Sequence, residues 1–93
     1  MALTLNSRVV ADPTALSTRV EGESIVLSRS EGLYFTIQGS GDRIWQLLST
    51  EVTVDDVVRT VRDEFDVDED RCSEDVLTFI QELADLRLVR LVA

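Results

Sequence analysis

The sequence predicts an α+β domain with a winged helix-turn-helix-like arrangement, in which an N-terminal three-stranded antiparallel sheet is followed by three helices. Two observations predict this class. Before residue 38, short β-prone runs alternate with glycine-containing turns at residues 21–23 and 30–32. After residue 38, apolar residues recur at helical spacing instead. Strands followed by helices are typical of a fold in which helices cover one face of an antiparallel sheet.

The sheet is predicted from three stretches of sequence. Residues 16–20, 24–29 and 33–37 are rich in β-branched, aromatic or aliphatic residues, and the turns between them favour a meander. A weaker strand over residues 2–10 is expected to end before Pro13, because proline has no amide hydrogen and restricts the residue that precedes it. Such a sheet is not stable alone, so we expect the helices to cover it.

The first helix is predicted to follow a tight glycine turn. Gly39 and Gly41 are expected to adopt the backbone angles of that turn, and Ser40 is expected to cap the helix. The helix should run to Leu48 and place Trp45 in the core, because its apolar residues recur on one face.

Two further helices are predicted from their caps and apolar stripes. Thr53 is expected to cap the second helix, and Asp68 the third, which should end near Leu86. Residues 88–92 are expected to extend the core or to form a weak strand. The stripe of the third helix is wider than packing on one neighbour requires. Its members are Cys72, Val76, Leu77, Phe79, Ile80, Leu83 and Ala84.

Composition restricts the functions that the chain can have. Its 93 residues, 44% hydrophobic and 29% charged, fit a single globular domain over residues 1–93. Neither a membrane span nor a signal peptide is recognisable, so we expect a cytoplasmic protein. The chain has no histidine, and Cys72 is its only cysteine. Ser-His and Cys-His catalysis and histidine metal sites are therefore excluded, and we predict no enzyme, no catalytic residue, no metal and no cofactor.

The net charge of −9 is unevenly distributed. Residues 51–85 contain thirteen Asp or Glu and three Arg, whereas residues 1–50 are close to neutral. The acidic residues either line solvated helix faces or attract a basic partner. Both interpretations disfavour binding of nucleic acid, whose phosphates are repelled by such a surface.

The remaining feature is a possible binding surface. If the strand at residues 33–37 lies at the sheet edge, its free amides and carbonyls could pair with an extended peptide. Beside that edge, the wide stripe of the third helix would form a groove for side chains of the peptide. Alternatively, the extra apolar width packs on the helix that carries Trp45 or on a homodimer partner.

Three stretches resemble the PqqD-like family: YFTIQGSGDRIWQLL, TVDDVVRTVRDEFDVD and DVLTFIQELADLRLV, which match it in order and spacing over residues 24–92. The resemblance implies a RiPP recognition element, most similar to the free-standing leader-binding proteins of lasso peptide biosynthesis. Such proteins bind the leader of a precursor peptide and deliver it to a separate leader peptidase, a transglutaminase-like cysteine protease, with an ATP-dependent macrocyclase as a possible further partner.

The resemblance also implies where the leader binds. The leader would add as a strand to the last strand of the meander and pack on the third helix. Arg43 to Trp45 match the family's R-I-W signature, and Arg87 stands where the family usually has glycine. Asp75 could pair with Arg43 or with a cation of the leader. The implied leader-binding residues are Leu33, Tyr34, Phe35, Thr36, Ile37, Asp75, Val76, Phe79, Ile80 and Leu83.

Two alternative functions remain open. The chain could be a structural or dimerisation subunit of a biosynthetic complex that contacts no peptide. A winged helix could also bind nucleic acid, but the predicted third helix carries seven acidic residues from Asp68 onward and a single Arg.

Overall fold

The structure is a computed structural model that describes residues 3–29 and 31–92. The chain forms, in order, β1 (Arg8–Ala11), β2 (Leu16–Val20), β3 (Glu23–Ser28), β4 (Leu33–Ile37), α1 (Gly39–Leu47), β5 (Val52–Thr53), α2 (Val54–Phe65), α3 (Glu69–Asp85) and β6 (Val89–Val92). The predicted α+β class and the three helices are confirmed. Ala2 in the predicted first strand and Ser30 in a predicted turn lie outside the described residues.

The predicted meander is the antiparallel sheet β2-β3-β4. Glu21 and Gly22 join β2 to β3 with φ angles of 51° and 81°. Two successive positive φ angles are the signature of a type I′ turn, whose twist matches that of the strands it joins. Val26 in the central strand faces the helices and is fully buried. The opposite face of this sheet exposes apolar side chains, among them Leu16 and Tyr34.

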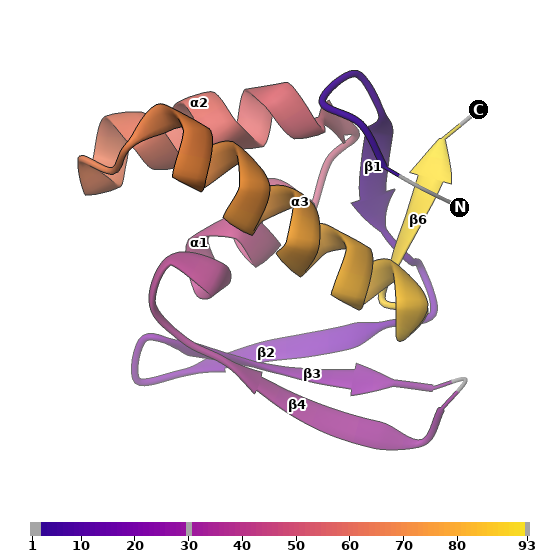
Figure 1. Cartoon of the computed structure of the whole chain (residues 1–93). Coiled ribbons are helices and arrows are strands. Elements are labelled where there is room, and N and C mark those ends of the chain that lie inside the picture. The colour runs from indigo at the N-terminus through magenta and orange to yellow at the C-terminus, as the bar shows by residue number, and fades with distance from the viewer. Residues whose placement is uncertain (1–2, 30, 93) are drawn as a thin grey trace.

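A second sheet, β5-β1-β6, was not predicted. It pairs β1 with β6 from the other end of the chain, and Val9 lies opposite Leu91. Figure 1 shows these two strands side by side, away from the β2-β3-β4 sheet. The predicted strand over residues 2–10 and the predicted tail thus complete one sheet. Long-range pairing of this kind leaves no local pattern in the sequence.

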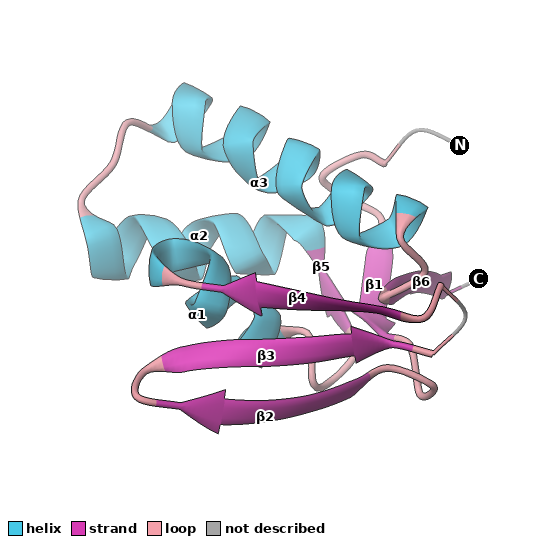
Figure 2. Ribbon diagram, turned by 90° about the horizontal axis from the view of Figure 1, so that it is seen from below, coloured by secondary structure: helices cyan, strands magenta, loops and turns pink. Residues whose placement is uncertain are grey.

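The three helices lie on one side of the β2-β3-β4 sheet (Figures 1 and 2). Trp45 is buried in the shared core, as predicted. In the described residues no helix combines the length and the apolar character needed to cross a membrane. The core consists of Val9, Val26, Ile37, Ile44, Trp45, Leu48, Val54, Val57, Val58, Val61, Cys72, Val76, Ile80, Leu83, Leu88 and Val89.

Two of the three predicted helix caps are confirmed. The Thr53 side chain accepts from the Asp56 amide, and the Asp56 carboxylate accepts from the Thr53 amide in return. Asp68 accepts from the amide of Arg71 at the start of α3. The prediction for Ser40 is wrong, because α1 already begins at Gly39. Gln38 therefore occupies the cap position and makes no side-chain capping bond.

The C-terminal end of α3 has a left-handed residue. Arg87 has a φ of 61°. The Arg87 amide donates to the Ala84 carbonyl, and the Leu88 amide donates to the Leu83 carbonyl at 2.9 Å. These two bonds define a Schellman motif, which usually has glycine at the left-handed position. Arg87 therefore carries the backbone strain that glycine would avoid.

A buried carboxylate joins α1 to the sheet. Asp42 is 5% exposed. It accepts hydrogen bonds from the Ser24 hydroxyl, from Arg19 at 2.8 Å and from the Gln46 amide at 3.0 Å. The Ser24 hydrogen bond, followed by Arg19, lowers the pKa of Asp42 below its usual value. The network satisfies the charge and fixes α1 against β2 and β3.

Candidate functional site

The free edge of β4 offers backbone hydrogen-bonding groups. Within the described residues β4 pairs with β3 alone. The turn at residues 21–22 closes on the Val20–Glu23 pair, which makes that pair hydrogen-bonded. Alternation across the registered strands then directs the amide and carbonyl groups of Tyr34 and Thr36 away from β3. An incoming strand would pair with these two residues.

The side chains of β4 divide between the two faces of the sheet. Leu33, Phe35 and Ile37 alternate toward the helical side, and their burial increases along the strand from 51% exposed at Leu33 to 6% at Ile37. Tyr34 is 73% exposed on the other face. The strand thus enters the core at its C-terminal end, where it leads directly into α1.

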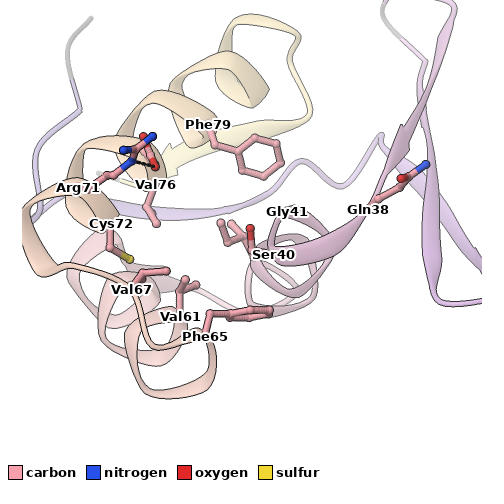
Figure 3. Close-up of a pocket in the computed structure, with 12 residues that line it drawn as sticks. Gln38, Ser40, Gly41, Val61, Phe65, Val67, Arg71, Cys72, Val76 and Phe79 are labelled. Atoms are coloured by element: carbon pink, nitrogen blue, oxygen red, sulfur yellow. Dashed lines mark ion pairs between the residues drawn. The ribbon is translucent and has the colours of Figure 1, made fainter.

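A cavity of about 550 Å³ opens at this end of β4. It lies between the first turn of α1, the C-terminal end of α2 and the N-terminal half of α3 (Figure 3). Its lining is mostly apolar, with polar groups from Gln38, Ser40, Arg71 and Asp75. The other lining residues are Gly41, Ile44, Val61, Phe65, Val67, Cys72, Val76 and Phe79.

Gly41 determines how closely α3 approaches α1 at the cavity. A Cβ atom on Gly41 would lie 3.2 Å from Phe79 Cζ and 3.2 Å from Ile37 Cγ2. Both distances are shorter than ordinary carbon contacts. A larger residue at this position would force Phe79 or Ile37 to shift by a few tenths of an ångström, so glycine serves close packing here, and not the turn that we predicted. The ring of Phe79 packs over Gly41 and forms one wall of the cavity.

Two apolar side chains are exposed at the cavity. Phe65 is 41% exposed and Val67 is 44% exposed, although both lie in the most acidic part of the chain. Cys72 also lines the cavity, but it is 4% exposed. Burial raises the pKa of the Cys72 thiol, which disfavours the nucleophilic thiolate.

The ion pair that Arg43 forms near the cavity differs from the predicted one. Arg43 donates to Glu64 at 2.9 Å and so joins α1 to the end of α2. The structural pair that we considered between Arg43 and Asp75 is therefore wrong. Asp75 instead lies 3.8 Å from Arg71, one turn earlier on α3, and both side chains are largely exposed. An exposed pair at this distance contributes little to stability.

The structure distributes the predicted leader-binding residues over three environments. Residues 33–37 form the free edge, which fulfils the condition that sequence analysis set for a peptide-binding strand. Asp75, Val76 and Phe79 line the cavity. Ile80 and Leu83, in contrast, are buried in the core at 0% and 4% exposure. Their burial leaves almost no surface of Ile80 and Leu83 exposed for a ligand to contact.

Of the twelve residues that line the cavity, sequence analysis assigned only Asp75, Val76 and Phe79 to the site; among the nine that it missed are Gly41, Ile44, Phe65 and Val67. Gly41 had been assigned to a turn, and Ile44 and Phe65 to the apolar stripes of their helices. Val67 carried a usable signal: an apolar residue between two aspartates in a turn between helices does not improve solubility, so its presence indicates a contact.

Within the described residues, no group of three or more His, Cys, Asp or Glu could hold a metal ion.

Comparisons with known proteins agree with this arrangement. The family model for coenzyme PQQ synthesis protein D (PqqD) matches residues 23–89, from β3 to the start of β6. A solved structure of TbiB1 in complex with the TbiA(beta) leader peptide is similar, with a TM-score of 0.83 and 26% identity. That similarity covers 90% of this chain and 98% of the TbiB1 chain. No curated protein matches the chain. Because the family model covers most of the sequence, including β4 and the cavity, this chain belongs to the PqqD family.

Proposed function

We propose that this protein binds the leader segment of a ribosomally made precursor peptide by adding it as a strand to β4. The observation that carries the proposal is the free β4 edge, which ends at an apolar cavity. Backbone pairing along Tyr34 and Thr36 would orient the leader, and the cavity would take one of its apolar side chains. The similarity to TbiB1, which was solved with a leader peptide, supports leader binding as the function.

A complex of useful affinity requires both the β4 edge and the cavity. Burying an aromatic ring of about 150 Å² at ~25 cal/mol per Å² contributes roughly 4 kcal/mol at most. A micromolar complex needs about 8 kcal/mol after the ordering costs are met. The ring alone is therefore insufficient. Hydrogen bonds along β4 and a second apolar contact, for which exposed Leu33 is available, must supply the rest.

The proposed role is non-catalytic. Cys72 is buried with a raised pKa, and the chain has no histidine to activate a nucleophile. By holding the precursor, the protein would raise the concentration of the leader at a separate peptidase of the transglutaminase-like cysteine protease type in lasso peptide biosynthesis. A macrocyclase could use the same complex.

A pair of proline substitutions tests the strand addition. Thr36→Pro removes an outward amide from β4 and places a ring where the leader backbone would pair. Ser17→Pro is the matched control, because Ser17 has the equivalent outward position on β2, the other edge of the sheet. Fluorescence anisotropy would measure binding of the labelled leader of the cognate precursor peptide.

We expect Thr36→Pro to weaken binding at least about tenfold, since one hydrogen bond and the strand geometry are lost together. Ser17→Pro should bind as the unmodified chain does. Circular dichroism would establish that both variants are folded. Equal affinities for all three proteins would refute strand addition to β4.

A further inference from the structure

The mouth of the cavity lies in the most negatively charged part of the chain. Residues 61–75 contain eight Asp or Glu and two Arg. Three of these acids lie next to or within the cavity lining: Asp66 and Asp68 flank the lining residue Val67 in the sequence, and Asp75 lines the cavity itself. We call these three residues the acidic collar.

Of the three basic residues near the collar, two pair with acids outside it, and the third, Arg71, lies beside Asp75 of the collar. Arg62 pairs with Glu69 at 3.3 Å, and Arg43 pairs with Glu64 at 2.9 Å. Arg71 lies 3.8 Å from Asp75, but the exposed fractions of these two side chains are 83% and 71%. Water therefore solvates the collar, which retains a net negative charge in the unbound protein.

A ligand that covers Phe65 and Val67 changes this balance. Its body would displace water from the carboxylates of the collar, and partly desolvated carboxylates are unfavourable unless a further cation pairs with them. A neutral ligand would leave that cost uncompensated, and an acidic ligand would increase it. A cation placed beside the apolar group would offset it with charge-assisted hydrogen bonds.

We propose that the segment bound in the cavity carries a lysine or arginine next to its apolar anchor residue, and that the acidic collar selects for this cation. The proposal rests on the proposed leader binding and specifies the class of leader that the site accepts. The cavity would take the apolar side chain, while the collar would discriminate between leaders of the same shape by the charge of the neighbouring residue.

The first test selects ligands without assuming a leader sequence. A displayed library of random short peptides would be panned against the full chain. We expect the enriched peptides to combine an aromatic or branched aliphatic residue with a lysine or arginine close to it in sequence. Enriched peptides with neutral or acidic neighbours would overturn the charge selection and leave leader binding intact. A library with no enriched peptide would count against both proposals.

The second test measures the charge effect directly. One enriched peptide would be synthesised with Lys, Gln or Glu at the position beside the anchor, and the dissociation constants would be measured by anisotropy at low and high salt. We expect roughly fivefold weaker binding at each step from Lys to Gln to Glu at low salt, and a smaller range at high salt. Equal affinities for the three peptides would overturn the proposal.

Matched protein variants assign the effect to the collar. Asparagine is isosteric with aspartate, tolerates the left-handed conformation of Asp66, and can cap α3 in place of Asp68. The triple variant Asp66→Asn, Asp68→Asn, Asp75→Asn should bring the ratio of Lys-peptide to Glu-peptide affinity close to one. The control Asp85→Asn removes a charge about 15 Å farther along α3 and should leave the ratio unchanged. A ratio that survives in the triple variant would refute the assignment.

Discussion

The two ends of α3 have opposite environments. Its C-terminal half packs into a closed region, in which Ile80, Leu83, Leu88 and Val89 are buried and a Schellman motif leads into β6. Its N-terminal half borders an open region, in which Phe65 and Val67 remain exposed beside the cavity. The same helix thus supports the fold at one end and offers a surface at the other, so substitutions at the two ends should separate stability from binding.

The largest effect is expected in the closed region. Ile80 is fully buried, so Ile80→Ala should lower the free energy of unfolding by about 2–5 kcal/mol through lost contacts and a residual cavity. Phe79→Ala, at the next position, removes a larger side chain from the open cavity, where water can replace it. Phe79→Ala should therefore lower the free energy of unfolding less than Ile80→Ala does, whereas it should weaken leader binding more. Urea denaturation of both variants would measure this, and equal losses of stability would contradict the distinction between the regions.

The next effect concerns the polar network that holds α1, one wall of the open region. Asp42→Asn should cost about 1–3 kcal/mol, because the buried hydrogen bonds lose their charged acceptor. The pKa of Asp42 is lowered in the folded protein. Its contribution is therefore fully present above the pKa of an unfolded aspartate, about 4, and is lost as the pH falls through the lower folded pKa.

Urea midpoints measured at neutral pH and near pH 3 would check this sign. The midpoint of the unmodified chain should fall more than that of Asp42→Asn over this interval. Glu74→Gln is the control, since Glu74 is exposed and makes no ion pair within the described part of the chain. A variant at Asp42 that kept the full pH dependence would show that other carboxylates govern acid stability.

The smallest effect is a gain in stability at a helix end. Arg87→Gly should stabilise the protein by about 1 kcal/mol, because glycine adopts a positive φ without strain from a Cβ atom. Asp66, which ends α2 beside the cavity, also has a positive φ, of 49°. Aspartate tolerates this conformation better than arginine, so Asp66→Gly should gain less. Thermal denaturation would compare the two, and a loss of stability in Arg87→Gly would mean that its side chain contributes more than its strain costs.

Local signals in the sequence were sufficient for the meander, the three helices and two of their caps. Each depends on residues close together in the chain, such as Thr53 and Asp56, or the glycine turn before β3. The β5-β1-β6 sheet could not be predicted in the same way. Val9 and Leu91 pair across almost the whole chain, and neither strand is long enough to have a clear alternation of its own.

The strand of the candidate site could be predicted from the sequence, whereas most of the cavity could not. The β-prone residues at 33–37 indicated a strand, and family resemblance implied that the leader pairs with it and that Asp75, Val76 and Phe79 lie beside it. The cavity depends on three helices that meet, and on a helical glycine, Gly41, whose role is to leave room for a side chain 38 positions later. Arg43 pairs with Glu64 because α1 packs on α2. This packing is a tertiary contact that the spacing of residues in the sequence does not reveal.

The proposed function depends on a leader that pairs with β4 and reaches into the cavity at its end. Amide NMR of the labelled protein during titration with the synthetic leader tests it most directly. We expect shifts at Tyr34 and Thr36, together with shifts at Val76 and Phe79, while β2 and the β5-β1-β6 sheet stay unchanged. Shifts confined to β2 or to β6 would contradict the claim and move the binding surface to another edge of the molecule.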